Sequence, residues 1–145
     1  MLEVFRKLHD EKEVRRFYVG GALGVDMWAA EQILRLKEQP GYEDIELVVA
    51  LPFVGHDAKW DQRSKRRMEF ILQHCSRKEV IGNKDCRESY IKRNCYMVDQ
   101  ANYLVAVYDD VRNLRSGTMQ CVRYAREKTG SGIFDSSRHS QYNLS

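Results

Sequence analysis

Two kinds of segment alternate along this 145-residue chain. In one kind apolar residues recur every three or four positions, and in the other they form short continuous runs. The first spacing predicts helices, and β-branched or aromatic runs predict buried strands. The predicted helices cover residues 2–13, 25–39, 60–75, 87–101 and 117–128. The predicted strands cover residues 17–19, 45–51, 79–81, 103–108 and 133–134. This alternation predicts βαβ units with right-handed crossovers, and therefore an α/β fold with a mostly parallel sheet.

The alternation continues without a linker or an internal repeat, which predicts one domain over residues 1–135. Residues 136–145 are polar and rich in serine, so we expect a frayed tail there. No apolar run approaches the roughly 18–20 residues that a membrane helix needs, and the N-terminus carries mixed charges unlike a signal peptide. We therefore expect a cytoplasmic protein that does not enter a membrane.

The stretch that carries most chemistry lies between the first predicted strand and the helix after it. Residues 17–19 run directly into a turn that holds three glycines, Gly20, Gly21 and Gly24. Glycine permits positive φ and a close approach of backbone to a ligand, and a helix N-terminus presents unpaired N–H groups to an anion. The spacing matches neither the GxGxxG dinucleotide motif nor a P-loop. A phosphate-binding turn and a tight turn without a ligand both remain open.

Two further loops are expected at the same edge of the sheet. Residues 52–57 leave the second long predicted strand, and residues 109–118 leave the strand at 103–108. In parallel sheets, ligands bind beyond the carboxyl ends of the strands, where such loops meet. We therefore expect one ligand site formed by these loops and by residues 20–26.

Several segments, in order along the chain, carry a resemblance to a known family. They are GGALGVDMWAAE at 20–31, LPFVGHDAKW at 51–60, KRNCYMVDQANYLVAVYD at 92–109 and SGT at 116–118. Together they resemble the YpsA-like group of the SLOG superfamily, which also includes DNA-processing protein A and lonely-guy phosphoribohydrolase domains. The resemblance implies a Rossmann-like three-layer sandwich that binds nucleotides or their derivatives, such as NAD or ADP-ribose.

The resemblance also implies which residues touch the ligand. The glycine turn would lie against it, namely Gly20, Gly21, Ala22, Leu23 and Gly24. A second phosphate-binding helix start would be Ser116, Gly117 and Thr118, with Arg115 adding a bidentate phosphate contact.

Other candidate residues flank these two turns. Arg93 would hold phosphate, and Asn94 would bond a sugar or a loop. Asp26, in the first turn of its helix, would either accept hydrogen bonds from ribose hydroxyls or complement the helix dipole. The remaining candidates lie where strands end at the site, and they are Pro52, Phe53, Tyr108 and Asp109.

The chain departs from the resemblance at its start. Members of the family usually open with a central strand that ends in Thr-Gly-His-Arg, and nothing before residue 15 fits this pattern. The expected fold therefore lacks the usual first strand. Either the remaining strands close up or a partner chain fills the gap, because an open strand edge seeks pairing. We expect a homodimer.

Two other functions remain as alternatives to ligand sensing or sequestration. A nucleoside monophosphate phosphoribohydrolase would carry PGGxGTxxE, but Cys121 stands where that motif has glutamate. A single-stranded DNA-binding protein would use the basic residues at 63–67 with Trp60 as a stacking platform, although a net charge of +3 gives this weak support. No convincing catalytic set is evident, and the four cysteines show no metal-ligand spacing.

Overall fold

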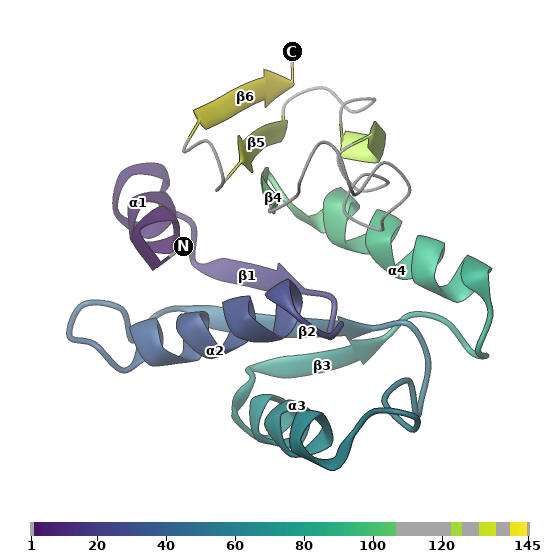
Figure 1. Ribbon diagram of the computed structural model, residues 1–145. Helices are drawn as coiled ribbons and strands as arrows, with labels where there is room; N and C mark the ends of the chain where they lie inside the picture. The colour runs from purple at the N-terminus through teal and green to yellow at the C-terminus, as the bar shows by residue number, and fades with distance from the viewer. Residues whose placement is uncertain (1, 107–122, 126–130, 136–139, 145) are drawn as a thin grey trace.

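The computed structural model describes residues 2–106, 123–125, 131–135 and 140–144, and its elements follow the predicted alternation (Figure 1). The helices are α1 (Leu2–Lys12), α2 (Val25–Lys37), α3 (Gln62–His74) and α4 (Arg87–Gln100). The strands are β1 (Arg16–Val19), β2 (Glu46–Leu51), β3 (Arg77–Val80), β4 (Tyr103–Ala106), β5 (Ser131–Asp135) and β6 (Ser140–Leu144). The predicted helix at 117–128 lies outside the described residues except for a helical stretch at 123–125.

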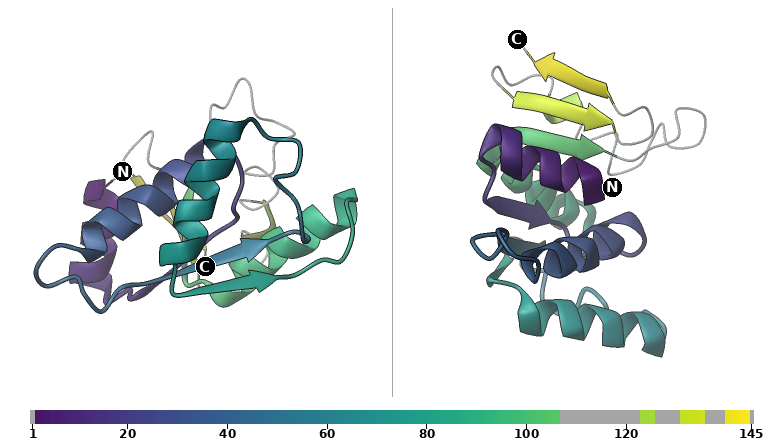
Figure 2. Two further views of the ribbon diagram at one scale, coloured as in Figure 1. Left: turned by 90° about the horizontal axis from the view of Figure 1, so that it is seen from below. Right: turned by 90° about the vertical axis from the view of Figure 1, so that its left-hand side faces the viewer.

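The first three strands form a parallel sheet in the order β1-β2-β3. Helices α2 and α3 lie on one face of this sheet and α4 lies on the other (Figure 2). The chain is therefore an α/β protein with a parallel sheet between helices, which confirms the Rossmann-like fold class.

Strand β2 is the centre of this sheet because its sequence is apolar on both faces. Leu47, Val48 and Val49 are fully buried, as expected for a parallel strand that is covered on both sides. From α2, Ile33 and Leu36 pack into the same core. The core fixes the register of β1 on β2, and with it the position of the turn that follows β1.

Strands β4, β5 and β6 form a second sheet in addition to the parallel one. Strand β5 pairs parallel to β4 and antiparallel to β6. Because β6 spans residues 140–144, part of the segment that was expected to fray is a strand that satisfies backbone hydrogen bonds of β5. In the part of the chain described, β1 and β4 belong to different sheets, so these strands have not closed up.

Two element boundaries also differ from the prediction for local reasons. Helix α3 begins at Gln62, after Trp60, because the Asp61 carboxylate caps it by accepting a hydrogen bond from Ser64 N at 2.9 Å. Strand β3 begins at Arg77 and not at residue 79 because its backbone pairs with β2 from Val48 onward. Its charged residues Arg77 and Lys78 are exposed, so apolar periodicity gave no signal for them.

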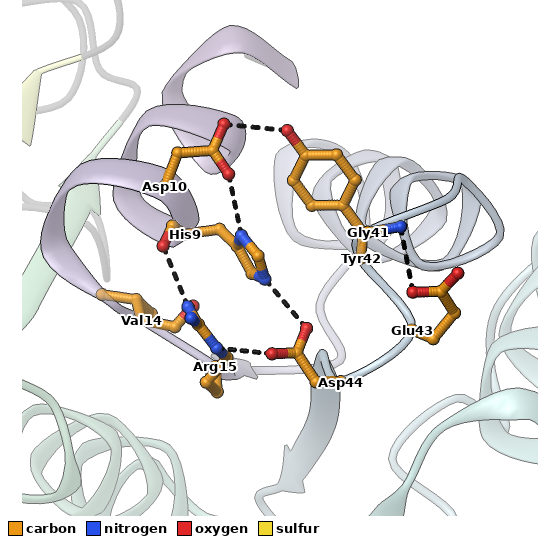
Figure 3. Close-up of polar contacts among 8 residues, drawn as sticks. All are labelled: His9, Asp10, Val14, Arg15, Gly41, Tyr42, Glu43 and Asp44. Carbon is orange, nitrogen blue, oxygen red and sulfur yellow. Dashed lines mark hydrogen bonds and ion pairs between the residues drawn. The ribbon is translucent and has the colours of Figure 1, made fainter.

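A polar cluster attaches α1 to the segment between α2 and β2 (Figure 3). Buried His9 lies between two carboxylates, with Nδ1 at 2.9 Å from Asp10 Oδ1 and Nε2 at 2.8 Å from Asp44 Oδ1. Tyr42 Oη donates to Asp10 at 2.9 Å, and Arg15 pairs with Asp44 at 2.5 Å. These contacts fix α1 beside β1.

Candidate functional site

The turn between β1 and α2 requires glycine at two positions. Gly21 and Gly24 have φ values of 68° and 83°, in the region that side chains rarely adopt. A Cβ on Gly21 would also stand 2.6 Å from Leu51 Cδ2, so this position is restricted by packing as well. A Cβ on Gly24 would meet nothing within 4 Å, which shows that the turn opens outward there.

The Asp26 carboxylate points back into this turn. Its Oδ2 accepts a hydrogen bond from Gly20 N at 3.1 Å, and Ala22 N–H also stabilises the carboxylate. Burial raises the pKa of Asp26 above its ordinary value, while the nearby Arg93 guanidinium and the two backbone hydrogen bonds oppose this rise. The N–H of Gly20 is thus already used by a carboxylate, so an anion would have to bind farther along the turn.

Arg93 and Asn94 connect α4 to the same turn from beneath. Both side chains are buried, with 6% of each exposed. Arg93 Nη1 donates to Gly20 O, and Arg93 Nε donates to Asn94 Oδ1 at 2.7 Å. These contacts position the turn, and a direct contact of Arg93 with phosphate stays a prediction.

The loop after β2 reaches the turn from the other side. His56 Nε2 donates to Gly21 O at 2.8 Å, and the Trp60 ring packs edge-on against His56 with centroids 5.1 Å apart. This contact places the 52–57 loop beside the glycine turn, as expected for loops at one sheet edge.

Pro52 and Phe53 are buried, so a ligand would reach only their backbone atoms and the edges of their side chains. Ligand contact by these two residues stays a prediction. The Phe53 ring packs edge-on against Tyr90 of α4, with centroids 5.7 Å apart. A Cβ on Gly82 would stand 2.3 Å from Pro52 O, which shows how closely the chain passes under this loop.

The accessible part of the turn is its outer side. Leu23, Val25 and Trp28 are 51%, 41% and 44% exposed. No described residue accepts a hydrogen bond from the backbone N–H of Leu23 or Gly24. Trp28 lies one helical turn beyond Gly24, to whose carbonyl its N–H donates at 3.0 Å. The sequence analysis did not single out Trp28, although a tryptophan in the first turn of a glycine-initiated helix was a visible signal.

The structure therefore brings the following predicted residues together at one turn: Gly20, Gly21, Ala22, Leu23, Gly24, Asp26 and Arg93. Asn94 bonds to Arg93, and Pro52 and Phe53 lie in the loop whose His56 contacts the turn. The other predicted residues lie outside the described part of the chain, and they are Tyr108, Asp109, Arg115, Ser116, Gly117 and Thr118. The second phosphate-binding turn at 116–118 accordingly stays a prediction.

The described residues give little support to the alternative functions. Arg67 of the basic cluster pairs with Glu31 of α2, so part of the positive charge of that cluster is used within the protein.

Within residues 2–106 and the short described segments that follow, His, Cys, Asp and Glu do not gather into a metal-ligating group. In the same residues, no helix combines the length and apolarity that crossing a membrane requires.

Comparison with known proteins identifies the family of this chain. The family model of YpsA, the YspA SLOG family, matches residues 1–134. The chain belongs to this family. A UPF0398 protein of Staphylococcus epidermidis is 28% identical over 94 residues, which cover 63% of this chain and 49% of the relative. A UPF0398 protein of Bacillus cereus is 29% identical over 94 residues, covering 63% and 50%.

A UPF0398 protein of Bacillus thuringiensis is 27% identical over 114 residues, covering 77% of this chain and 59% of the relative. This SLOG chain thus spans about half to three-fifths of the length of these curated relatives. Family membership confirms the resemblance carried by the ordered motifs and indicates a nucleotide-related Rossmann-like domain.

Proposed function

We propose that this SLOG chain binds a nucleotide or nucleotide derivative of the NAD or ADP-ribose class, and senses or sequesters it. The observation that carries the proposal is the glycine turn, which two distant segments hold in shape while its outer side stays open. Arg93 holds the turn from α4, and His56 holds it from the loop after β2. A turn fixed in this way is preorganised, so binding needs little further ordering of the protein.

The ligand phosphate would bind at the outer part of the turn. Asp26 already accepts the hydrogen bond from Gly20 N, so a phosphate bound beside Gly20 would face a carboxylate. The N–H groups of Leu23 and Gly24 and the positive end of the α2 dipole lie farther out. Gly24, whose missing side chain leaves open space, is the position at which the ligand would approach most closely.

An aromatic surface lies next to this anion position. Trp28 is 44% exposed and one helical turn from Gly24, close enough for a base or nicotinamide ring to stack on it. A phosphate site beside an exposed indole suits a nucleotide better than inorganic phosphate.

Binding without turnover fits the side chains that surround the turn. Asp26, Arg93 and His56 are the ionisable groups that contact it in the described residues, and each one bonds to the turn itself. A cytoplasmic location and a homodimer are two further predictions. Cell fractionation and sedimentation at several protein concentrations test them.

Substituting Gly24 by alanine tests the proposal. Gly24→Ala places a methyl group in the open part of the turn, where the ligand would lie. Gly41→Ala is the matched control, because Gly41 also has a positive φ, 92°, and also has nothing within 4 Å of its Cβ position. Both variants place alanine at a positive φ, a conformation that costs about 1–3 kcal/mol. Gly41 lies between α2 and β2, away from the turn.

Calorimetric titration with ADP-ribose, NAD, AMP and a short single-stranded oligonucleotide measures the result. We expect ADP-ribose or NAD to bind, and Gly24→Ala to weaken that binding at least about tenfold, equivalent to 1.4 kcal/mol, while Gly41→Ala leaves it unchanged. Equal binding by both variants would contradict the proposed site. Tight binding of the oligonucleotide alone would favour the DNA-binding alternative, and adenine release from AMP would favour the phosphoribohydrolase.

A further inference from the structure

The inner part of the glycine turn already holds an anion, and that anion is a side chain of the protein. The backbone N–H of Gly20 donates to Asp26 Oδ2 at 3.1 Å, and the N–H of Ala22 bonds to the same carboxylate. Backbone N–H groups that converge on one point form a concavity of the kind that binds anions. In this turn the concavity lies between the end of β1 and the start of α2.

A buried cation from a different helix lies at the same point. Arg93 of α4 is 6% exposed, and its Nη1 donates to Gly20 O. A Cβ on Gly20 would stand 2.7 Å from Asp26 Oδ2 and 2.9 Å from Arg93 Nη1, so the absence of a side chain at this position leaves room for both charged groups. Because α4 lies on the opposite face of the sheet from α2, this positive charge is separate from the dipole of α2 (Figure 2).

These groups together stabilise negative charge at the inner part of the turn. The Arg93 guanidinium and the N–H groups of Gly20 and Ala22 all oppose the rise in the pKa of Asp26 that burial causes. Each of them would act in the same way on any other anion at this point.

The position of the Asp26 carboxylate differs from that of an ordinary acidic residue in a first helical turn. Such a carboxylate interacts with the helix dipole while it remains in water. The Asp26 carboxylate instead reaches back six positions to the N–H of Gly20, where burial raises its pKa. Asp61 at the start of α3 shows the contrast, because it accepts a hydrogen bond from Ser64 N, three positions ahead, and is exposed.

We propose that Asp26 is a specificity-determining residue, whose carboxylate occupies the anion position of the inner turn and thereby excludes free inorganic phosphate. A phosphate would compete with the carboxylate for the same N–H groups, and the two negative charges would repel each other. A bare phosphate is then left with the outer N–H groups alone. This inference concerns the inner part of the turn and does not depend on nucleotide binding at its outer part.

Removing the carboxylate tests the proposal. Asp26→Ala deletes the internal anion and leaves Arg93 and the two N–H groups around the space that it held. Asp61→Ala is the matched control, since it also deletes a carboxylate that bonds to backbone N–H, at an exposed position. In calorimetric titration we expect inorganic phosphate to bind Asp26→Ala at least about tenfold more tightly than it binds the wild type or Asp61→Ala. The double variant Asp26→Ala/Arg93→Met should lose this gain.

Thermal melts apply the same test to a weakened fold. Asp26→Ala leaves the buried charge of Arg93 without this carboxylate, so the variant should melt at a lower temperature than the wild type. A ligand that binds only the folded state raises the midpoint, so about 50 mM phosphate should raise that of Asp26→Ala by at least about 3 °C more than those of the wild type and Asp61→Ala. Comparing the three proteins removes the general effect of phosphate on stability.

Three results would overturn the proposal. One is an equal effect of phosphate on the wild type, Asp26→Ala and Asp61→Ala. Another is an Asp26→Ala chain that stays unfolded in phosphate, because the added anion should replace the deleted carboxylate. The third is a gain that persists in the double variant, which would mean that phosphate binds away from Arg93.

Discussion

Replacing Arg93 by methionine should destabilise the protein, and the part of the loss that involves Asp26 can be separated from the loss of the hydrogen bonds to Gly20 and Asn94. Asp26 Oδ2 and Arg93 Nη1 lie 2.7 and 2.9 Å from the point where a Cβ on Gly20 would stand, so they are at most about 5.6 Å apart. At an effective dielectric constant of about 20, unit charges at this distance attract by about 3 kcal/mol. Because part of the Asp26 side chain remains accessible to solvent, we expect a coupling free energy of about 2 kcal/mol.

The stability lost in Arg93→Met should increase with pH. Burial raises the pKa of Asp26 above its ordinary value of 3.8, so ionising this carboxyl costs folding free energy. This free-energy cost is absent at a pH below the pKa of Asp26 in the unfolded chain, and it grows as the pH rises through the pKa of Asp26 in the folded chain. Arg93 opposes this rise in pKa, so its removal raises the pKa of Asp26 further. Arg93→Met should therefore lose more stability near neutral pH than at about pH 4.

A double-mutant cycle measures the effect. Urea unfolding of the wild type, Arg93→Met, Asp26→Asn and the double variant, followed by tryptophan fluorescence from about pH 4 to about pH 8, gives the coupling free energy. Arg67→Met is the control, since its ion pair with Glu31 lies at the surface and should contribute less than about 1 kcal/mol. Additive effects of Arg93→Met and Asp26→Asn, within about 0.5 kcal/mol, would refute the reasoning, as would a loss that does not change with pH.

Two further predictions concern packing and the cluster around α1. Gly82→Ala should lower the free energy of unfolding by about 1–3 kcal/mol, because its Cβ would stand 2.3 Å from Pro52 O and 2.5 Å from Ser89 Oγ; an unchanged melting temperature would contradict the close approach. The hydrogen bond from His9 holds the pKa of Asp44 below its usual 3.8. The stability that ionised Asp44 contributes is therefore present at a pH above its pKa in the unfolded chain, and it is lost as the pH falls through its pKa in the folded chain. Asp44→Asn should therefore destabilise the protein near neutral pH and have little effect in strong acid, and thermal melts that differ equally at every pH would argue against this.

The sequence predicted the elements whose signals are local. Strand β2 is a continuous apolar run, and α2 follows a glycine turn, so spacing and composition sufficed for both. The separation into two sheets and strand β6 depend on pairing between distant segments, which the apolar spacing of one segment does not encode. The start of α3 depended on the side chain of Asp61, which ends the extended segment before Gln62.

For the candidate site, the structure shows contacts among predicted residues and leaves their ligand roles as predictions. Gly20, Asp26 and Arg93 contact one another, although Gly20 and Arg93 are 73 positions apart. Their contacts could not be predicted, because a carboxylate in a first helical turn serves a ribose or its own backbone equally well. In the folded chain Asp26 accepts a hydrogen bond from Gly20 N, and its contact with a ribose stays a prediction.

The two outer strands of the first sheet have opposite consequences for solubility. Strand β3 ends that sheet on one side, and its exposed Arg77 and Lys78 discourage another strand from adding there, as charged edges do in natural proteins. Among the described residues, strand β1 ends the sheet on the other side, and its exposed charge, Arg16, is paired with Glu46 of β2 at 2.8 Å. Because this ion pair offsets the charge of Arg16, we expect aggregation in concentrated solution to begin at β1 and not at β3.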